Sequence, residues 1–318
     1  MKSIKSVLTH ACLFAFLTFV FSCSSAGAEK NATTGMNYLG TTPGDSLIKS
    51  YLTLPDSTLI DFIKWDLTLH SRLTHDGTFV LHIGFGESQP NTLGFKGGGS
   101  KRSITGTYII YQSQDKNLRG EIYQLKSDEE PDFALSLVKL DDNLFHLLSS
   151  ENRLMVGNGG WSYTLNRKEV PINESGALPV LTSLSDRVDD TRLQVIFEGR
   201  TPCLDFARDH NLAVFSDCLK LKWKLTLNRD PVTLLPTTYQ LKRTDIREVN
   251  ELTGKWAIDY GTRSNPGAII YTLDPDKPER AISLLAGDEN VIFFLNKNYQ
   301  LYVGNEDFSF TLNKRKQL

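Results

Sequence analysis

Apolar and polar residues alternate along most of the chain. Leu67 and Leu69, and then Phe79 and Leu81, stand at every second position on either side of a turn signal at 74–77. Successive side chains of a strand point to opposite faces, and glycine in a short turn favours a hairpin. Further runs of this kind follow at 108–111, 122–125, 133–137, 144–147 and 163–165. The pattern predicts seven or eight short antiparallel strands.

The same pattern occurs twice. The segment Tyr-Leu-Gly-Thr-Thr-Pro at 38–43 has a counterpart, Phe-Glu-Gly-Arg-Thr-Pro, at 197–202, and 154–167 has one at 301–314. The offset between the copies falls from 159 to 147 while their order is kept, which indicates a duplicated module with altered loops. We therefore predict a signal peptide at 1–22, a tether at 23–37, a first module at 38–167, a linker at 168–192 and a second module at 193–318.

Short meandering strands of this number favour a small barrel, because closure leaves no exposed sheet edge. Each module also has one helical candidate, at 45–51 and at 205–211, directly after the repeated Gly-x-Thr-Pro motif. Asp45 is a suitable N-cap for the first of these helices. The predicted fold is all-β, with two tandem small antiparallel barrels that each carry one short helix.

The N-terminus has a basic start and an apolar run at 7–21, about 15 residues long, which is typical of a signal peptide and short for a membrane-spanning helix. The following Val-Phe-Ser-Cys ending at Cys23 resembles the lipobox of bacterial lipoproteins. The resemblance implies that Cys23 is lipidated and becomes the new N-terminus. The alternative is an ordinary signal peptide cut after Ala28. Since Ser24 follows Cys23 and no acidic run does, the resemblance implies the outer membrane, facing the periplasm.

Two cysteines remain beyond the N-terminal segment, Cys203 and Cys218. In an oxidising periplasm they are expected to form a disulfide. The formal net charge is −2 and no basic stripe occurs, so nucleic acid is not an expected partner.

The order Gly-x-x-Pro-Cys-x-Asp at 199–205, a Leu-Thr-Leu strand, Gly-x-aromatic and Tyr-x-Leu resembles the N-terminal domain of NlpE-type copper-resistance lipoproteins. The resemblance covers each module nearly end to end. It implies lipocalin-like barrels, an outer-membrane anchor and a part in envelope stress sensing. That family carries a Cys-x-x-Cys loop suited to copper(I). Here Phe206 replaces the second cysteine and the first module has neither, so copper binding through this motif does not carry over.

Two histidines are the remaining metal candidates. His70 and His82 fall on one predicted hairpin and are expected opposite each other on its outer face, where they could bind a divalent metal. Two solvated histidines are the alternative. No Gly-x-Ser-x-Gly elbow occurs, and the acidic pairs at 141–142 and 189–190 fall in a turn and in the linker, so no catalytic residue is predicted.

The sequence therefore predicts a non-enzymatic envelope lipoprotein that binds, senses or scaffolds. Its partners would be the membrane, through the lipid, and an unknown envelope protein or small apolar ligand. No cofactor is predicted, and copper is the one candidate. A metal-handling protein and an apolar-ligand carrier with a lipocalin-like lumen are the alternative functions. The candidate contact loop, for which plain turn geometry is the alternative, consists of Gly40, Pro43, Asp45, Gly199, Pro202 and Asp205.

Overall fold

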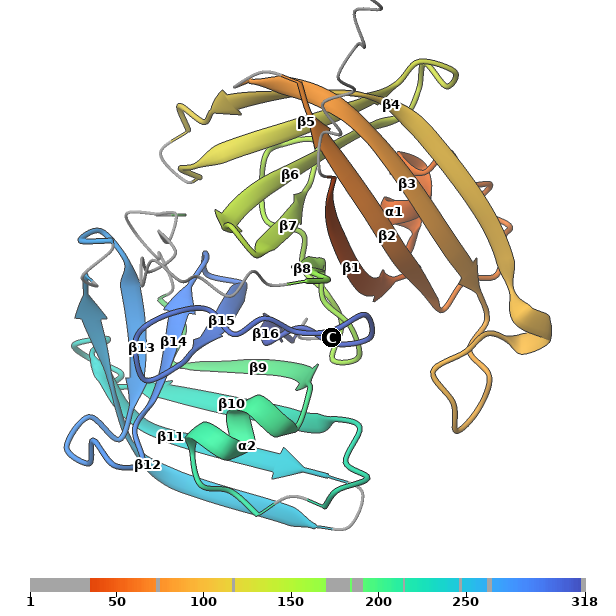
Figure 1. Ribbon diagram of the computed structural model, residues 1–318. Helices are drawn as coiled ribbons and strands as arrows, with labels where there is room; N and C mark the ends of the chain where they lie inside the picture. The colour runs from red at the N-terminus through yellow and green to blue at the C-terminus, as the bar shows by residue number, and fades with distance from the viewer. Residues whose placement is uncertain are drawn as a thin grey trace, which may run out of the picture. The chain divides into compact units, whose positions relative to one another are not determined.

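The structure is a computed structural model that describes residues 35–72, 75–115, 118–169, 184, 191–213, 215–245, 248–261 and 265–315. The predicted signal peptide, Cys23 and most of the predicted linker lie outside the described residues. The described part forms two closed eight-stranded antiparallel barrels with one short α-helix each (Figure 1), which confirms the predicted fold class.

In each barrel, neighbouring strands pair in sequence order and the last strand pairs with the first. The first barrel consists of β1 (Met36–Pro43), β2 (Phe62–Ser71), β3 (Asp76–Gly86), β4 (Ser100–Gln112), β5 (Glu121–Ser127), β6 (Ala134–Asp141), β7 (Leu144–Leu148) and β8 (Thr164–Arg167), with a 3-10 turn η1 (Lys96–Gly98) before β4. The second consists of β9 (Gln194–Thr201), β10 (Leu221–Arg229), β11 (Pro236–Thr244), β12 (Val249–Tyr260), β13 (Ile269–Leu273), β14 (Ile282–Ala286), β15 (Val291–Leu295) and β16 (Thr311–Lys314).

Equivalent residues of the two copies make equivalent contacts. The indole N–H of Trp65 donates to the Thr42 hydroxyl at 2.8 Å, and that of Trp223 donates to the Thr201 hydroxyl at 2.9 Å. Both tryptophans are buried in the apolar interior of their own barrel. The repeat seen in the sequence is therefore a repeat of packing, which allows the two barrels to be compared position by position.

A short helix follows the first strand of each barrel: α1 (Ser46–Tyr51) and α2 (Leu204–Asp209). Asp45 caps α1 by accepting the Ile48 N–H at 3.1 Å, as predicted. The helix α2 begins one residue earlier than predicted, and Cys203 is at its N-cap position. No side chain caps this helix. Within the described ranges, no helix is both long enough and apolar enough to span a bilayer.

A third cluster of buried apolar side chains joins the two barrels. It comes from β5–β7 of the first barrel and β13–β15 of the second, and it includes Ile122 and Leu144 with their counterparts Ile270 and Val291. Every residue of β7 and β15 is buried, because one face of each strand lines a barrel and the other faces this cluster. Strands buried on both faces have continuous apolar sequences rather than alternating ones.

Equivalent residues also meet one another across this contact. The hydroxyl oxygens of Ser162 and Ser309 lie 2.6 Å apart, and those of Thr164 and Thr311 lie 2.9 Å apart. The partners in each pair are 147 positions apart, which is the offset of the repeat at this end of the modules. A residue that meets its own copy marks a twofold relation between the packed surfaces.

Two asparagines repeat this relation. The side chain of Asn166 accepts the Gly304 N–H at 2.7 Å, and the side chain of Asn313 accepts the Gly157 N–H at 2.8 Å. Each asparagine stands in the last strand of one barrel and each glycine in the last loop of the other. The barrels are therefore packed like the two subunits of a homodimer, within one chain.

Candidate functional site

The two glycines of the predicted contact loop lie within strands, Gly40 in β1 and Gly199 in β9. A Cβ at Gly40 would lie 2.9 Å from the Thr164 carbonyl oxygen, and one at Gly199 would lie 2.5 Å from that of Thr311. Both distances are too short for a side chain. These glycines recur because the first and last strands of each barrel approach closely there, which is a packing role.

The other members of the predicted loop also have structural partners. Asp45 caps α1 and accepts the Tyr163 hydroxyl at 2.8 Å, while Asp205 pairs with the exposed Arg208 at 2.9 Å. Pro43 ends β1, and Pro202 directly follows β9. Pro43 and Asp45 do line a crevice of about 480 Å³.

The predicted histidine pair does not form. His70 lies opposite Thr78 and His82 lies opposite Asp66, because Ser71 pairs with Gly77 and shifts every partner four positions from the expected register. Both histidines alternate with core residues and so face outward, as expected. In the described ranges, no three His, Cys, Asp or Glu side chains gather as metal ligands. Metal binding by this protein remains a prediction, and the positions of His70 and His82 do not support it.

The predicted disulfide is confirmed. Cys203 and Cys218 are bonded, with their Cα atoms 6.1 Å apart. Cys203 is buried at the start of α2, and the bond ties this helix to the segment that leads into β10. The second helix is thus fastened covalently at the end where the first is capped by Asp45.

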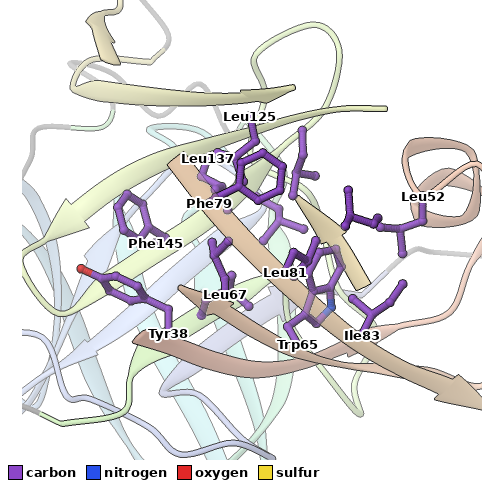
Figure 2. Close-up of a cluster of buried hydrophobic side chains, with 14 of the residues drawn as sticks. Tyr38, Leu52, Trp65, Leu67, Phe79, Leu81, Ile83, Leu125, Leu137 and Phe145 are labelled. Atoms are coloured by element: carbon purple, nitrogen blue, oxygen red, sulfur yellow. The ribbon is translucent and has the colours of Figure 1, made fainter. Parts of the chain in front are cut away.

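The two barrels differ most beneath their helices. In the first barrel this end is filled by Leu52, Ile83 and Phe133, whose side chains are 0%, 2% and 1% exposed. Figure 2 shows Leu52 and Ile83 beside Trp65 within the continuous apolar cluster of the first barrel. Phe133 stacks on Phe79 with ring centroids 6.0 Å apart. The interior of the first barrel is closed at this end by hydrocarbon.

The second barrel has polar residues at the same three positions. His210 directly follows α2 at its C-cap position, as Leu52 directly follows α1. Arg243 pairs with Trp223 in the register in which Ile83 pairs with Trp65. The third replacement is Phe133 by Arg280. Ile282 pairs with Leu273 in the second barrel as Leu135 pairs with Leu125 in the first, so Ile282 and Leu135 are equivalent. Arg280 and Phe133 each stand two residues before them.

These replacements leave a cavity of about 220 Å³ under α2. Its apolar walls are formed by Phe206, Leu212, Trp223, Leu241, Leu252 and Ile282, and its polar groups are His210, Arg243, Asn250 and Arg280. Leu241 and Trp223 belong to the buried core, whereas Leu252 is 40% exposed. The cavity therefore runs from the rim of the barrel to its apolar interior.

Two buried nitrogens in this cavity have no hydrogen-bond partner: Nε2 of His210 and Nε of Arg243. The His210 ring stacks on Phe206 with centroids 4.2 Å apart. An unpaired buried polar group costs about 1–3 kcal/mol, so stability alone would not select this arrangement. Burial is the main cause that lowers the pKa of His210, with a smaller contribution from Lys297 and opposition from Asp209. Burial also lowers the pKa of Arg243, against Asp245 and Glu248.

Arg280, in contrast, has its charge neutralised. It forms an ion pair with the buried carboxylate of Asp274, which also accepts the Tyr239 hydroxyl at 2.8 Å. A Cβ at Gly254 would lie 2.0 Å from that carboxylate, so only glycine leaves room for it. This network fixes Arg280 at the cavity wall. Of the two arginines that line the cavity, Arg243 is the one that forms no ion pair with a described residue.

A larger hollow, of about 710 Å³, lies along the polar side chains of β10–β12 and includes Thr226, Gln240 and Thr253. These residues alternate with core positions, so the hollow runs over the outer face of the sheet. Tyr239 is the one large apolar side chain among its described lining residues, and its cations, Lys255 and Lys277, are exposed to solvent, unlike the buried Nε of Arg243. We therefore take the cavity under α2 as the candidate site.

The pattern of a single copy gives no signal for this site. Arg243, His210 and Arg280 each look like ordinary surface residues when the second copy is considered alone. The available signal was the difference between the copies: at three inward positions, Ile, Leu and Phe of the first copy are replaced by groups that carry or accept a proton.

Comparisons of the chain with models of protein families, with curated proteins and with solved structures found no match. The resemblance to NlpE-type lipoproteins therefore remains a prediction from short motifs.

Proposed function

We propose that this chain is a lipid-anchored, non-enzymatic binding protein of the bacterial envelope, in which the second barrel takes up a small ligand. The first barrel is its permanently packed partner. The anchor and the envelope location rest on the lipobox-like sequence ending at Cys23. The observation that carries the binding role is the cavity of about 220 Å³ under α2, at a place where the first copy is solid.

Ligand pockets are mainly apolar, with a few polar groups that fix orientation. The cavity has this composition. Its volume exceeds the roughly 150 Å³ of an engineered apolar cavity that admits benzene, so a body the size of one ring fits. The partly exposed Leu252 stands where such a molecule would enter.

A binding role is favoured over catalysis by the groups in the cavity. It holds arginines, one histidine and one asparagine, and among its lining residues there is no serine, cysteine or carboxylate that could act as a nucleophile. The arginines can attract and orient a molecule. The protein would then act by releasing such a ligand, or by a change in the envelope that follows ligand binding.

The test uses the full-length protein and the neutral probe 3-phenylpropanol, with binding followed by calorimetry and tryptophan fluorescence, since Trp223 lines the cavity. Leu241→Phe fills the cavity and should abolish binding. Val249→Phe adds the same group on the surface, at a side chain 68% exposed, and should leave binding intact. The proposal would be contradicted if neither the probe nor its carboxylate analogue showed saturable binding. It would also be contradicted if the two variants bound the probe equally well.

A further inference from the structure

The ligand's chemistry can be narrowed further if the proposed binding function holds. We infer that the cavity under α2 receives a small amphiphilic anion, a carboxylate on a ring-sized or short-chain apolar body. Its carboxylate would lie against Arg243 and His210.

The two unpaired nitrogens indicate the charge of the ligand. Arg243 has five N–H donors and no acceptor, so only a hydrogen-bond acceptor can satisfy its buried Nε. Planar guanidinium groups match carboxylates through two parallel hydrogen bonds. Nε2 of His210, which is also without a partner, can donate to the same anion when it carries its proton.

The surrounding charges leave this role to Arg243. Asp274 neutralises Arg280. Asp245 and Glu248, in the hairpin after β11, act on Arg243 electrostatically, but neither forms an ion pair with it among the described residues. The Asp245 carboxylate accepts the backbone N–H of Glu248 at 2.7 Å. A ligand carboxylate would be the first anion in direct contact with Arg243.

The order of residues along β11 gives the direction of the ligand. Leu241 and Arg243 both face inward, with Leu241 in the buried core and Arg243 next to the end of the strand at Thr244. Alternate residues of a strand are about 6.6 Å apart. The apolar body would lie against Leu241 and Trp223, and the carboxylate would lie at the rim, where the cost of removing it from water is lowest.

The first barrel supplies matched substitutions. Ile83 occupies the position of Arg243 in the same fold. Arg243→Ile therefore removes the cation and leaves a side chain that this architecture already accepts. Arg208→Ile removes an equal charge from the exposed face of α2, where Arg208 pairs with Asp205 and Asp209, and it controls for net charge.

The experiment compares 3-phenylpropionate with 3-phenylpropanol, which have the same ring and chain, by calorimetry on the full-length protein. We expect the acid to bind at least tenfold more tightly than the alcohol. Arg243→Ile should reduce the affinity for the acid to that for the alcohol, and Arg208→Ile should leave both affinities unchanged. Thermal unfolding of each variant checks that it is folded.

A second measurement follows the His210 ring by NMR. A bound anion favours the imidazolium, so saturation with the acid should raise the pKa of His210, whereas the alcohol should not. Lys297 and Asp209, the charged groups that act on this ring, are present in both titrations.

The outcomes separate the two proposals. If acid and alcohol bind equally, or if Arg243→Ile leaves the affinity for the acid unchanged, the anionic ligand is wrong and the binding function stands. If neither probe binds, both proposals are wrong.

Discussion

The two barrels share strand order, register and a helix after the first strand, and they differ in what fills the space beneath that helix. The first holds its helix with the Asp45 cap and fills the space with Leu52 and Phe133. The second holds its helix with a disulfide and has a cavity there, with the half-buried Arg243, whose buried Nε has no hydrogen-bond partner. The same architecture thus encloses a filled core in one copy and a cavity in the other, and the exchanges at the positions of Leu52, Ile83 and Phe133 mark the difference.

The largest effect is expected from exchanging the residues at one matched position. Ile83→Arg would bury an unpaired cation in a filled core and should destabilise the protein by about 4 kcal/mol or more. Arg243→Ile should be neutral or stabilising, because it removes an unpaired buried donor. Denaturant unfolding of both variants measures the difference. Equal costs would show that the second barrel has no space beneath its helix that the first barrel lacks.

The fastening of the helices gives the next comparison. Replacing Cys203 and Cys218 by serine opens a loop of sequence separation 15 and should cost about 3 kcal/mol. Asp45→Ala removes the cap of α1 and should cost about 1 kcal/mol. Unfolding by denaturant without reductant measures both values. A disulfide-free variant as stable as the parent would mean that α2 is held by its packing alone.

A pH-dependent difference is expected at His146, which lies between the barrels where the second copy has Phe293. Its ring is fully buried, bonds to Thr164 and to the Met155 carbonyl oxygen, and packs 5.6 Å from the Phe293 ring. Burial lowers its pKa from the ordinary 6.5 to about 4. The unfolded chain therefore binds the proton first, and stability is lost as the pH falls from 6.5 to 4, by up to about 3 kcal/mol.

Two aspartates act in the opposite direction over part of this range. Burial raises the pKa of Asp141 and of Asp288 to about 6, so their contribution to stability is lost as the pH rises. The effect of His146 is isolated by comparing the protein with His146→Asn at each pH. The stability difference between them should shrink below pH 6.5, and a constant difference would show that the ring is not held neutral.

The last comparison concerns the volume of one side chain. Leu81→Phe would overfill the first barrel and should cost about 1–3 kcal/mol. Leu241→Phe, at the matched position of the second barrel, enters the cavity and should be close to neutral. Thermal unfolding of the two variants under identical conditions compares them. A loss at Leu241 as large as that at Leu81 would show that the cavity cannot accept a ring.

Much of this fold was predictable because its signals are local or repeated. Alternation at residues such as Leu67 and Leu81 predicted strands, the matched order of two copies predicted two barrels, and Asp45 was a predictable cap. Two cysteines in a chain with a predicted signal peptide predicted a disulfide. Each of these predictions needs only neighbouring residues or the comparison of one copy with the other.

The contact between the barrels and the cavity were not predicted, since both depend on which face a side chain takes in three dimensions. The unbroken apolar runs of β7 and β15 carry a signal for burial on both faces, but a short apolar run fits several structures. The hairpin register at His70 failed for a related reason: one shift in the turn moves every partner along the strand.

The pairing of Ser162 with Ser309, and of Thr164 with Thr311, has a consequence for how such a protein can change. In a dimer of identical chains, every substitution appears in both subunits, so a cavity opened in one is opened in the other and the assembly loses stability twice. Joining the two halves in one chain removes that constraint. One half can keep a full core and carry the fold, while the other can give up buried hydrocarbon for a polar, partly empty interior.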